Sequence, residues 1–256
     1  ARAHQERRIE KGAVIIERPD ITINLEGAGE NITVSLDEDP LAPKAHLLVS
    51  ELMVLTNAAL AAWAKEHGIA LLHRTQDVAI PKEFSGIWQT PLEIARVVKA
   101  LAPAVLETNP RPHAGLGEAM YAPSTSPLRR YPDMINETQI ISLLRDGKPR
   151  WSKEELDTLL PLLNAHLDAA GQVQRFRPRY WKLLYFKQQG DRWWPAVITD
   201  ENDAFVTVNM PKEQMIVRAR RQFFGERAHP GQELEIRLGK VHPLQNDFQL
   251  LETREI

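Results

Sequence analysis

The sequence contains no cysteine among its 256 residues. Disulfide bonds and thiolate metal sites are therefore excluded, and this composition is typical of proteins that work in a reducing cytoplasm. No apolar run approaches the roughly 20 residues that a transmembrane helix requires, and no signal peptide opens the chain. The sequence thus predicts a cytoplasmic protein without a membrane partner.

Several common catalytic and ligand-binding motifs are also missing. There is no phosphate-binding Walker loop, no GxGxxG dinucleotide motif and no GxSxG nucleophile motif. The eight histidines are scattered without a metal-binding spacing. The net charge is only −2, so a polyanionic partner such as nucleic acid requires a local basic patch.

The order of apolar patterns predicts an α+β protein of two domains. Alternating apolar residues at 21–25 and 32–36 predict an antiparallel pair of strands. Helices are predicted at 46–68, 90–105 and 152–171, and the first of these is apolar nearly all round, so it should be buried. Five short strand-like segments after residue 190 predict a small S1/OB-like barrel. We expect domains at 1–188 and 189–256.

One acidic segment invites a metal interpretation. Asp37 and Asp39 in "SLDEDP" lie on the same side of a predicted strand end, where their oxygens could bind a hard cation such as Mg²⁺. The alternative is a solvated acidic loop that leads into the following helix, and this arrangement is far more common in proteins. We therefore predict no metal ligands in this chain.

The segment "TSPLRRYPD" places two arginines beside a predicted helix start. We expect Ser126 to be the N-cap, with Pro127 in the first turn. Cations are unfavourable at that end of a helix, unless an anion such as phosphate binds there. Arg129 and Arg130 could then bind phosphate oxygens, or they could pair with acids such as Asp133.

Residues 171–190 combine five basic and five aromatic side chains and contain no acid. Such a surface suits single-stranded nucleic acid, because phosphates meet the charges and bases stack on the rings. The alternative is an amphipathic helix whose aromatic side chains pack inward. The predicted RNA-binding residues here are Arg175, Arg177, Arg179 and Tyr180.

Three segments resemble the RNase II (RNB) family of hydrolytic 3′→5′ exoribonucleases. The most specific is "PHAGLGEAMYAPSTSPLRRYPDMIN", whose core matches the T-S-P-hydrophobic-R-R/K-Y-x-D motif of that family. "RPDITI" and "SELMVLTN" match two further family segments in the same order, the second through Glu51, Met53 and Asn57. The resemblance implies the C-terminal part of an RNB catalytic domain, with helices packed on a sheet, followed by an S1 domain.

The resemblance also implies a mechanism and its residues. A single RNA strand threads a channel and is degraded processively to nucleoside 5′-monophosphates and short end products, with Mg²⁺ held by aspartates. By motif position, Arg129 is the catalytic arginine that contacts the scissile phosphate. Thr125, Ser126, Arg130 and Tyr131 are expected to bind RNA beside it.

The aspartate-rich metal loop of the family belongs before "RPDITI", and residues 1–18 contain no aspartate. We therefore expect the Mg²⁺ ligands to come from an N-terminal part of the same enzyme, and this chain alone to be inactive. The alternative is a catalytically inactive RNB-like protein that binds RNA or another protein. The predicted barrel has ten basic and eleven acidic residues over 187–256, so RNA binding there would need a sorted face, with Arg218, Arg220 and Arg221 as candidates.

Overall fold

The computed structural model describes residues 1–39, 43–225 and 228–256. Their contacts group the chain into two compact units. One unit comprises residues 1–16, 42–88 and 97–168, and the other comprises residues 17–41, 89–96 and 169–256. Each unit has a hydrophobic core of its own.

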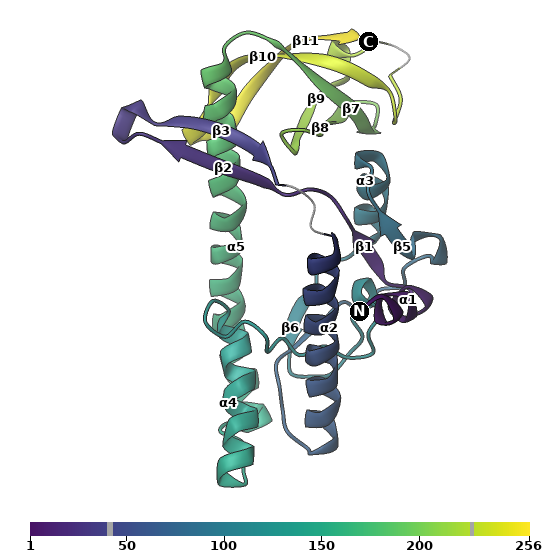
Figure 1. Cartoon of the computed structure of the whole chain (residues 1–256), viewed down its shortest axis with the longest axis vertical. Helices are drawn as coiled ribbons and strands as arrows, with labels where there is room; N and C mark the ends of the chain where they lie inside the picture. Colours follow the sequence, from purple (N-terminus) through teal and green to yellow (C-terminus); the bar gives the residue numbers. More distant parts are fainter. Residues whose placement is uncertain (40–42, 226–227) are drawn as a thin grey trace. The chain divides into compact units, whose positions relative to one another are not determined.

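The first unit is built from helices with short strand pairs between them (Figure 1). Strands β1 and β5 pair in parallel, and β4 and β6 pair antiparallel. The elements are α1 (Arg2–Glu10), β1 (Val14–Ile16), α2 (Pro43–Glu66), β4 (His73–Thr75), β5 (Gly86–Trp88), β6 (Val105–Glu107), α4 (Tyr131–Asp146) and the start of α5 (Lys153–Gln189). The predicted α+β class is confirmed. Helix α3 (Pro91–Ala100) is shared between the units.

Helix α2 departs from the expectation that it is buried all round. Its inner side contributes fully buried residues, such as Ala61 and Asn57. Its other side exposes a stripe of large apolar side chains, with Val49 57% exposed. The stripe consists of Leu48, Val49, Leu52 and Leu55. Although α2 is apolar on nearly all sides, the described residues leave one of its sides exposed.

By length and composition, Lys44–Glu66 of α2 would also suffice to cross a membrane, with a mean hydropathy of 1.6. This corrects the expectation that no segment reaches that length. However, Glu51 and Asn57 lie within this segment and are bound to polar groups of the first unit. Such polar residues in the middle of the helix favour packing against protein over packing against lipid.

The second unit contains a hairpin and a curled sheet (Figure 1). The predicted antiparallel pair is β2 (Ile21–Glu26) and β3 (Thr33–Glu38), in register from Ile21 opposite Glu38. The five predicted C-terminal strands are β7 (Trp193–Glu201), β8 (Phe205–Met210), β9 (Met215–Arg220), β10 (Glu233–His242) and β11 (Asp247–Glu255). They form one antiparallel sheet in the order β11-β10-β7-β8-β9. Because β9 and β11 are its edges, the sheet is a half-barrel.

The half-barrel packs against the C-terminal turns of α5. Alternate residues of β7, β8 and β9 are buried, as the period of two predicts. Leu183 and Phe186 of α5 complete this core, and the ring of Phe186 meets the ring of Trp194 edge to face at 4.8 Å. The end of the helix is therefore part of the core of this unit.

Helix α5 is longer than its sequence pattern predicts. It runs for 37 residues and continues through Pro178 beyond residue 171, where we predicted its end. The C-terminal end also holds the hairpin, since Gln188 accepts a hydrogen bond from the Val34 amide at 2.9 Å and donates one to the Ile32 carbonyl at 2.6 Å. A domain boundary at residue 188 stays a prediction.

Candidate functional site

The predicted arginine segment forms a tight turn rather than the first turn of a helix. The carbonyl of Ser126 accepts hydrogen bonds from the amides of Arg129 and Arg130 at 3.2 and 3.0 Å. Helix α4 begins only at Tyr131, with Arg130 as its N-cap and Pro132 in its first turn. The prediction of Ser126 as N-cap was therefore wrong. Proline is favoured in the first turn, and Pro132 meets this preference in place of Pro127.

The two arginines have different surroundings. Arg130 donates from Nη2 to Oδ1 of Asp133 at 2.6 Å, and Asp133 is only 1% exposed. The same carboxyl oxygen accepts the Ser126 amide at 3.0 Å. The Arg129 guanidinium lies outside this network and makes only a long contact, 3.5 Å from Nη2 to the Ser126 hydroxyl, among the described residues. The sequence left phosphate binding and acid pairing open, and Arg130 is the arginine that pairs.

Two large apolar side chains accompany the free arginine at the surface. Leu128 and Tyr131 flank the arginine pair, and both are exposed. Thr125 and Ser126 lie half-buried on the other side of the same turn. The structure thus brings together the predicted residues Thr125, Ser126, Arg129, Arg130 and Tyr131.

A buried asparagine of α2 holds the turn in place. Asn57 is fully buried and accepts the Ser124 amide at 2.9 Å. Its amide nitrogen donates to the Tyr121 hydroxyl at 2.8 Å and to the Thr125 hydroxyl at 3.3 Å. Asn57, from the family segment "SELMVLTN", therefore fixes the backbone that leads into the family motif "TSPLRRYPD".

Two further buried amides tie α4 to its surroundings. Asn136 forms hydrogen bonds with both backbone groups of Leu72 at 2.8 Å and with the carbonyl of Pro123 at 2.8 Å. Gln139 is bound in the same manner to Trp151 and to the carbonyl of Ala70. Sequence analysis missed both residues, although polar residues on the inner face of an otherwise apolar helix are a usable signal.

Glu51 of α2 anchors the N-terminal helix. It accepts hydrogen bonds from Arg8 Nε at 3.0 Å and pairs with His4 Nδ1 at 2.7 Å. Burial alone would raise the pKa of Glu51, but the bonds from Arg8 and His4 outweigh it and lower the pKa. Gly117 lies beside this contact with a φ of +67°, and a Cβ there would be 2.6 Å from the Arg8 carbonyl oxygen. Only glycine fits that approach without strain.

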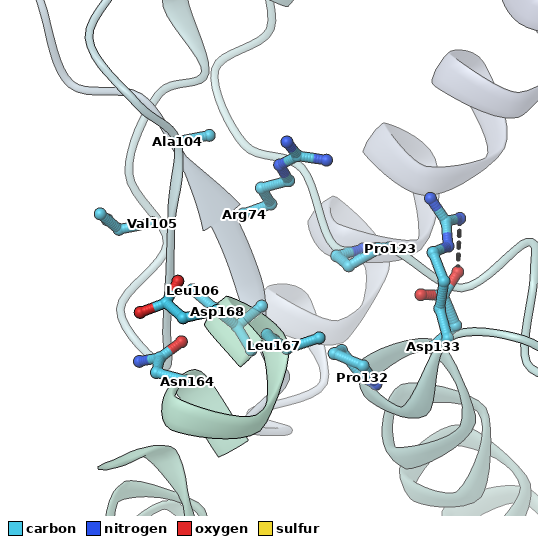
Figure 2. A pocket seen from close by; sticks show the side chains of 11 residues that line it. Arg74, Ala104, Val105, Leu106, Pro123, Pro132, Asp133, Asn164, Leu167 and Asp168 are labelled. Carbon is cyan, nitrogen blue, oxygen red and sulfur yellow. Dashed lines mark hydrogen bonds and ion pairs between the residues drawn. The ribbon is translucent and has the colours of Figure 1, made fainter. Parts of the chain in front are cut away.

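A pocket of about 490 Å³ lies beside the turn (Figure 2). Arg130, Pro132 and Asp133 of the turn and of α4 line one part of it. The remaining lining comes from β4, β6, the loop before the turn, and α5: Arg74, Ala104, Val105, Leu106, Pro123, Asn164, Leu167 and Asp168. Arg129 does not line this pocket.

The described residues do not form a Mg²⁺ site. No group of three or more histidine, aspartate or glutamate side chains gathers there in a metal-binding arrangement. Asp37 accepts a hydrogen bond from Asn24, and Asp39 accepts bonds from Thr22, across the hairpin of β2 and β3. These two aspartates therefore stabilise the hairpin, and the ligands for a magnesium ion would have to come from elsewhere.

The predicted RNA-binding residues of α5 lie in the second unit. Arg175 and Arg177 are exposed, whereas Arg179 is half-buried against the half-barrel. Its Nε donates to Asn246 at 2.5 Å, and its guanidinium lies 5.7 Å from the ring centre of Phe248. Tyr180 packs edge-on against Trp181 at 4.8 Å. RNA binding by these four residues stays a prediction, and Arg179 has a structural partner already.

The sequence profile of the RNB domain matches residues 1–146. The chain belongs to the RNB family. In this RNB chain the matched residues include the turn with Arg129 and Arg130, the buried Asn57 and the whole of α4.

The chain is also similar to proteins named as ribonucleases. The RNB chain is 25% identical over 248 residues to an uncharacterized ribonuclease of Synechocystis, covering 94% of this chain and 36% of the relative. It is 26% identical over 219 residues to the chloroplastic/mitochondrial ribonuclease II of Arabidopsis thaliana. This similarity covers 82% of this chain and 26% of that relative. The RNB chain thus spans only about a quarter to a third of the length of these relatives.

Solved structures confirm the fold. An active-site mutant of the Dss1 exoribonuclease from Candida glabrata matches 96% of the chain with a TM-score of 0.79 at 22% identity, over 33% of its own length. Mycoplasma genitalium RNase R without ligand matches 96% of the chain with a TM-score of 0.75 at 16% identity, over 47% of its own length. Both the first unit and the half-barrel therefore have the fold of RNB-type proteins.

Proposed function

We propose that this chain forms part of an exoribonuclease that hydrolyses single-stranded RNA processively from its 3′ end to nucleoside 5′-monophosphates and short end products. The observation that carries the proposal is that the two arginines of the family motif have different partners. Arg130 is committed to Asp133, while Arg129 projects its guanidinium to solvent from a backbone that Asn57 and Ser126 fix. A free, pre-positioned guanidinium suits a phosphate group.

The role proposed for Arg129 is to stabilise charge at the scissile phosphate. Charge increases on the phosphate oxygens as water attacks, and a guanidinium held in place strengthens its hydrogen bonds at that moment. Removal of one such contact costs about 2–4 kcal/mol of transition-state stabilisation. Thr125, Ser126, Arg130 and Tyr131 would then shape the same turn or contact the strand that it binds.

Magnesium dependence is part of the proposal, but the ion cannot be placed among the described residues. We therefore propose that the ligands belong to an N-terminal part of the same enzyme. The relatives named above support this idea, since each is much longer than the chain. The half-barrel would serve as an S1-type RNA-binding domain, and the lack of cysteine is compatible with a cytoplasmic location.

The surface of the first unit has exposed apolar faces that a protein partner would cover. Helix α2 exposes its apolar stripe, and α4 exposes a second apolar row that includes Met134, Ile141 and Leu144, with Leu144 69% exposed. Contiguous apolar faces of this kind mark protein contacts. Glu51 and Asn57 within α2 argue for a protein partner over lipid. We propose that the part that carries the metal ligands covers these faces.

Reconstitution tests this proposal. The chain would be mixed with a separately produced N-terminal part of an RNB relative, and Mg²⁺-dependent release of nucleoside monophosphates from a uniformly labelled single-stranded oligomer would be measured. We expect release only from the mixture, and none from either part alone. Activity of this chain by itself would overturn the proposed division of the site.

A catalytically inactive RNA-binding protein is the second candidate. It is favoured by the lack of a metal-binding group among the described residues and by a fold match to a yeast pseudonuclease, Ssd1, with a TM-score of 0.54 over 80% of the chain. If the mixture binds the oligomer, shows complex formation and yet releases no nucleotide, this second function replaces the first.

A further inference from the structure

The two edges of the β2–β3 hairpin have different surroundings. Gln188 of α5 occupies the edge of β3, where it accepts the Val34 amide at 2.9 Å and donates to the Ile32 carbonyl at 2.6 Å. Bonded and non-bonded pairs alternate along an antiparallel ladder. Because the Val34 amide points outward, its cross-strand partner Leu25 also points its amide and carbonyl outward, along the edge of β2. The helix thus covers the edge of β3 and leaves these groups of β2 on the opposite side.

The same alternation places the backbone of Ile23 on the outer edge of β2, since Ile23 pairs with Leu36 two positions along the ladder. The Asp39 amide donates to the Asp20 carbonyl at 2.9 Å between the strands, as the alternation requires for that pair. Among the described residues, no hydrogen bond outside the ladder reaches the backbone of Ile23 or Leu25. The edge of β2 therefore offers donors and acceptors at every second residue, which is the spacing that an added strand needs.

An apolar groove of about 370 Å³ lies beside this edge. Ile23 and Leu25 line it from the hairpin, and Val173 and Trp181 line it from α5. Leu25 is 43% exposed and Val173 is 64% exposed, so the groove is open to a partner. In Figure 1, β3 crosses α5 nearer to the C-terminal end of the helix than β2 does. A strand added to β2 would therefore lie over the turns of α5 that begin at residue 173.

The charges around the groove indicate what kind of molecule fits it. Residues 21–39 contain five acidic side chains and no basic one, whereas residues 169–189 of α5 contain five basic side chains and no acidic one. A polyanion such as RNA would be attracted by the helix but repelled by the hairpin. A second copy of the hairpin would bring five more acidic side chains to the same edge. A protein segment that carries basic side chains meets neither obstacle.

We propose that the edge of β2 binds an extended segment of a partner protein as a third, antiparallel strand. Apolar residues at every second position of the segment would fill the groove against Val173 and Trp181. Basic residues between them would lie on the other face of the sheet, beside Glu26 and Asp37. A two-stranded hairpin alone is marginally stable in water, and a third strand stabilises it. This inference does not depend on the nuclease activity proposed above.

A synthetic peptide that alternates valine with lysine is the probe, and its binding to the full chain would be measured by fluorescence anisotropy. In an antiparallel addition the residues opposite Ile23 and Leu25 are the apolar ones, so the valine amides face β2. Methylation of the valine amides should therefore weaken binding about tenfold, and methylation of the lysine amides should leave it unchanged. Equal binding of the two methylated peptides, or no binding of the parent peptide at about 1 mM, would overturn the proposal.

Hydrogen exchange provides a readout at the edge itself. The amides of Ile23 and Leu25 should exchange rapidly in the free chain, because they point away from β3, and about tenfold more slowly with the valine–lysine peptide bound. The Val34 amide, which Gln188 already accepts, should exchange at the same rate in both states. Protection of Val34 without protection of Ile23 and Leu25 would place the peptide elsewhere and reject the site.

Variants of the two walls separate this edge from general stickiness. Leu25→Pro removes an outward donor and spares the ladder, since proline is tolerated at such edge positions, and it should weaken the peptide about tenfold. Val173→Lys places a charge in the groove from the α5 side and carries the test if Leu25→Pro fails to fold. Leu244→Lys changes a side chain that is 87% exposed and lies outside the groove, so it should bind the peptide as the parent chain does. An equal loss of binding in Leu244→Lys would refute a specific site.

Two further measurements test the other possible occupants. A single-stranded oligoadenylate that displaces the peptide and loses affinity in Leu25→Pro would make the groove an RNA surface, which would overturn the proposal. Sedimentation would detect a dimer of the parent chain, and a dimer that Leu25→Pro dissociates would make a second copy the occupant and reject a separate partner. We expect the oligoadenylate not to displace the peptide, and Leu25→Pro not to change the oligomeric state.

Discussion

The carboxyl oxygen Oδ1 of Asp133 accepts a hydrogen bond from Arg130 at 2.6 Å and one from the Ser126 amide at 3.0 Å. One buried atom therefore joins the first turn of α4 to the tight turn before it. This contact fixes the backbone on both sides of Arg129 without using the Arg129 side chain, so the buried ion pair and the exposed guanidinium belong to different arginines.

The first prediction separates these two roles. Arg130→Ala should lower the free energy of unfolding by about 1.5–3 kcal/mol, because a buried carboxylate loses its charged partner. Arg129→Ala should change it by less than about 0.5 kcal/mol, as is usual for exposed positions. In the reconstituted enzyme, Arg129→Ala should lower turnover about 10²–10³-fold. Urea unfolding and single-turnover RNA cleavage measure the two effects, and unchanged turnover would make Arg129 a structural residue.

The second prediction concerns Asn57. Asn57→Ala should cost about 2–4 kcal/mol of stability, because the Ser124 amide, which is buried with its residue, loses its acceptor and a cavity remains. Hydrogen exchange should show faster exchange of amides at 121–126 than elsewhere in the first unit. A matched substitution, Ala59→Ser at an exposed position of the same helix, should leave that exchange unchanged.

The third prediction concerns pH. Burial lowers the pKa of both His73 and His113 to about 4 from an ordinary 6.5. Between pH 6.5 and 4, these histidines bind protons in the unfolded chain but not in the folded chain. Above pH 6.5 they do not lower the free energy of unfolding, and below it the free energy of unfolding falls as the pH falls. The slope reaches about 1.4 kcal/mol per pH unit for each histidine.

Urea midpoints at pH 7, 6 and 5 check this slope. The double variant His73→Asn, His113→Asn should show a flatter dependence on pH, even if its stability at pH 7 is lower. His46→Asn changes an exposed histidine and should keep the parent slope. A parent chain with equal stability at pH 7 and pH 5 would contradict the prediction.

The fourth prediction divides the basic residues of α5. Arg179→Ala should destabilise the half-barrel by about 1–3 kcal/mol, because Asn246 and Phe248 lose their contact with the guanidinium. Arg177→Ala, at an exposed position two residues earlier in the same helix, should leave stability unchanged. If α5 binds RNA, Arg177→Ala should instead reduce the salt dependence of oligomer binding by about one unit of log–log slope. Equal stability losses in both variants would contradict this division.

Much of the fold could be predicted from the sequence, because its signals are local. Alternating apolar residues identified the β2–β3 hairpin and the presence of five strands after residue 190. The length of α5 could not be predicted, because Gly171 and Pro178 normally end helices and packing of Leu183 and Phe186 against the half-barrel depends on distant residues.

The sequence located the arginine turn, but it did not predict how the residues of that turn are arranged. The motif identified Arg129 and its neighbours, yet it gave no reason to prefer Asp133 as the partner of Arg130 over Arg129. That choice depends on where α4 begins, and the start is set by Pro132 and by hydrogen bonds of Ser126. The exposure of one side of α2 was likewise hidden, because sequence shows how apolar a helix is but not what covers it.

The open half-barrel has a consequence for solubility. Strand β9 is an edge strand of the sheet, and edge strands can pair with strands of other molecules. Arg218 and Arg220 place positive charge on the outward side of this strand, and Arg218 also covers the ring of Phe205 at 4.4 Å. These arginines would repel a second β9 edge, so their neutralisation should promote aggregation even where no RNA is involved.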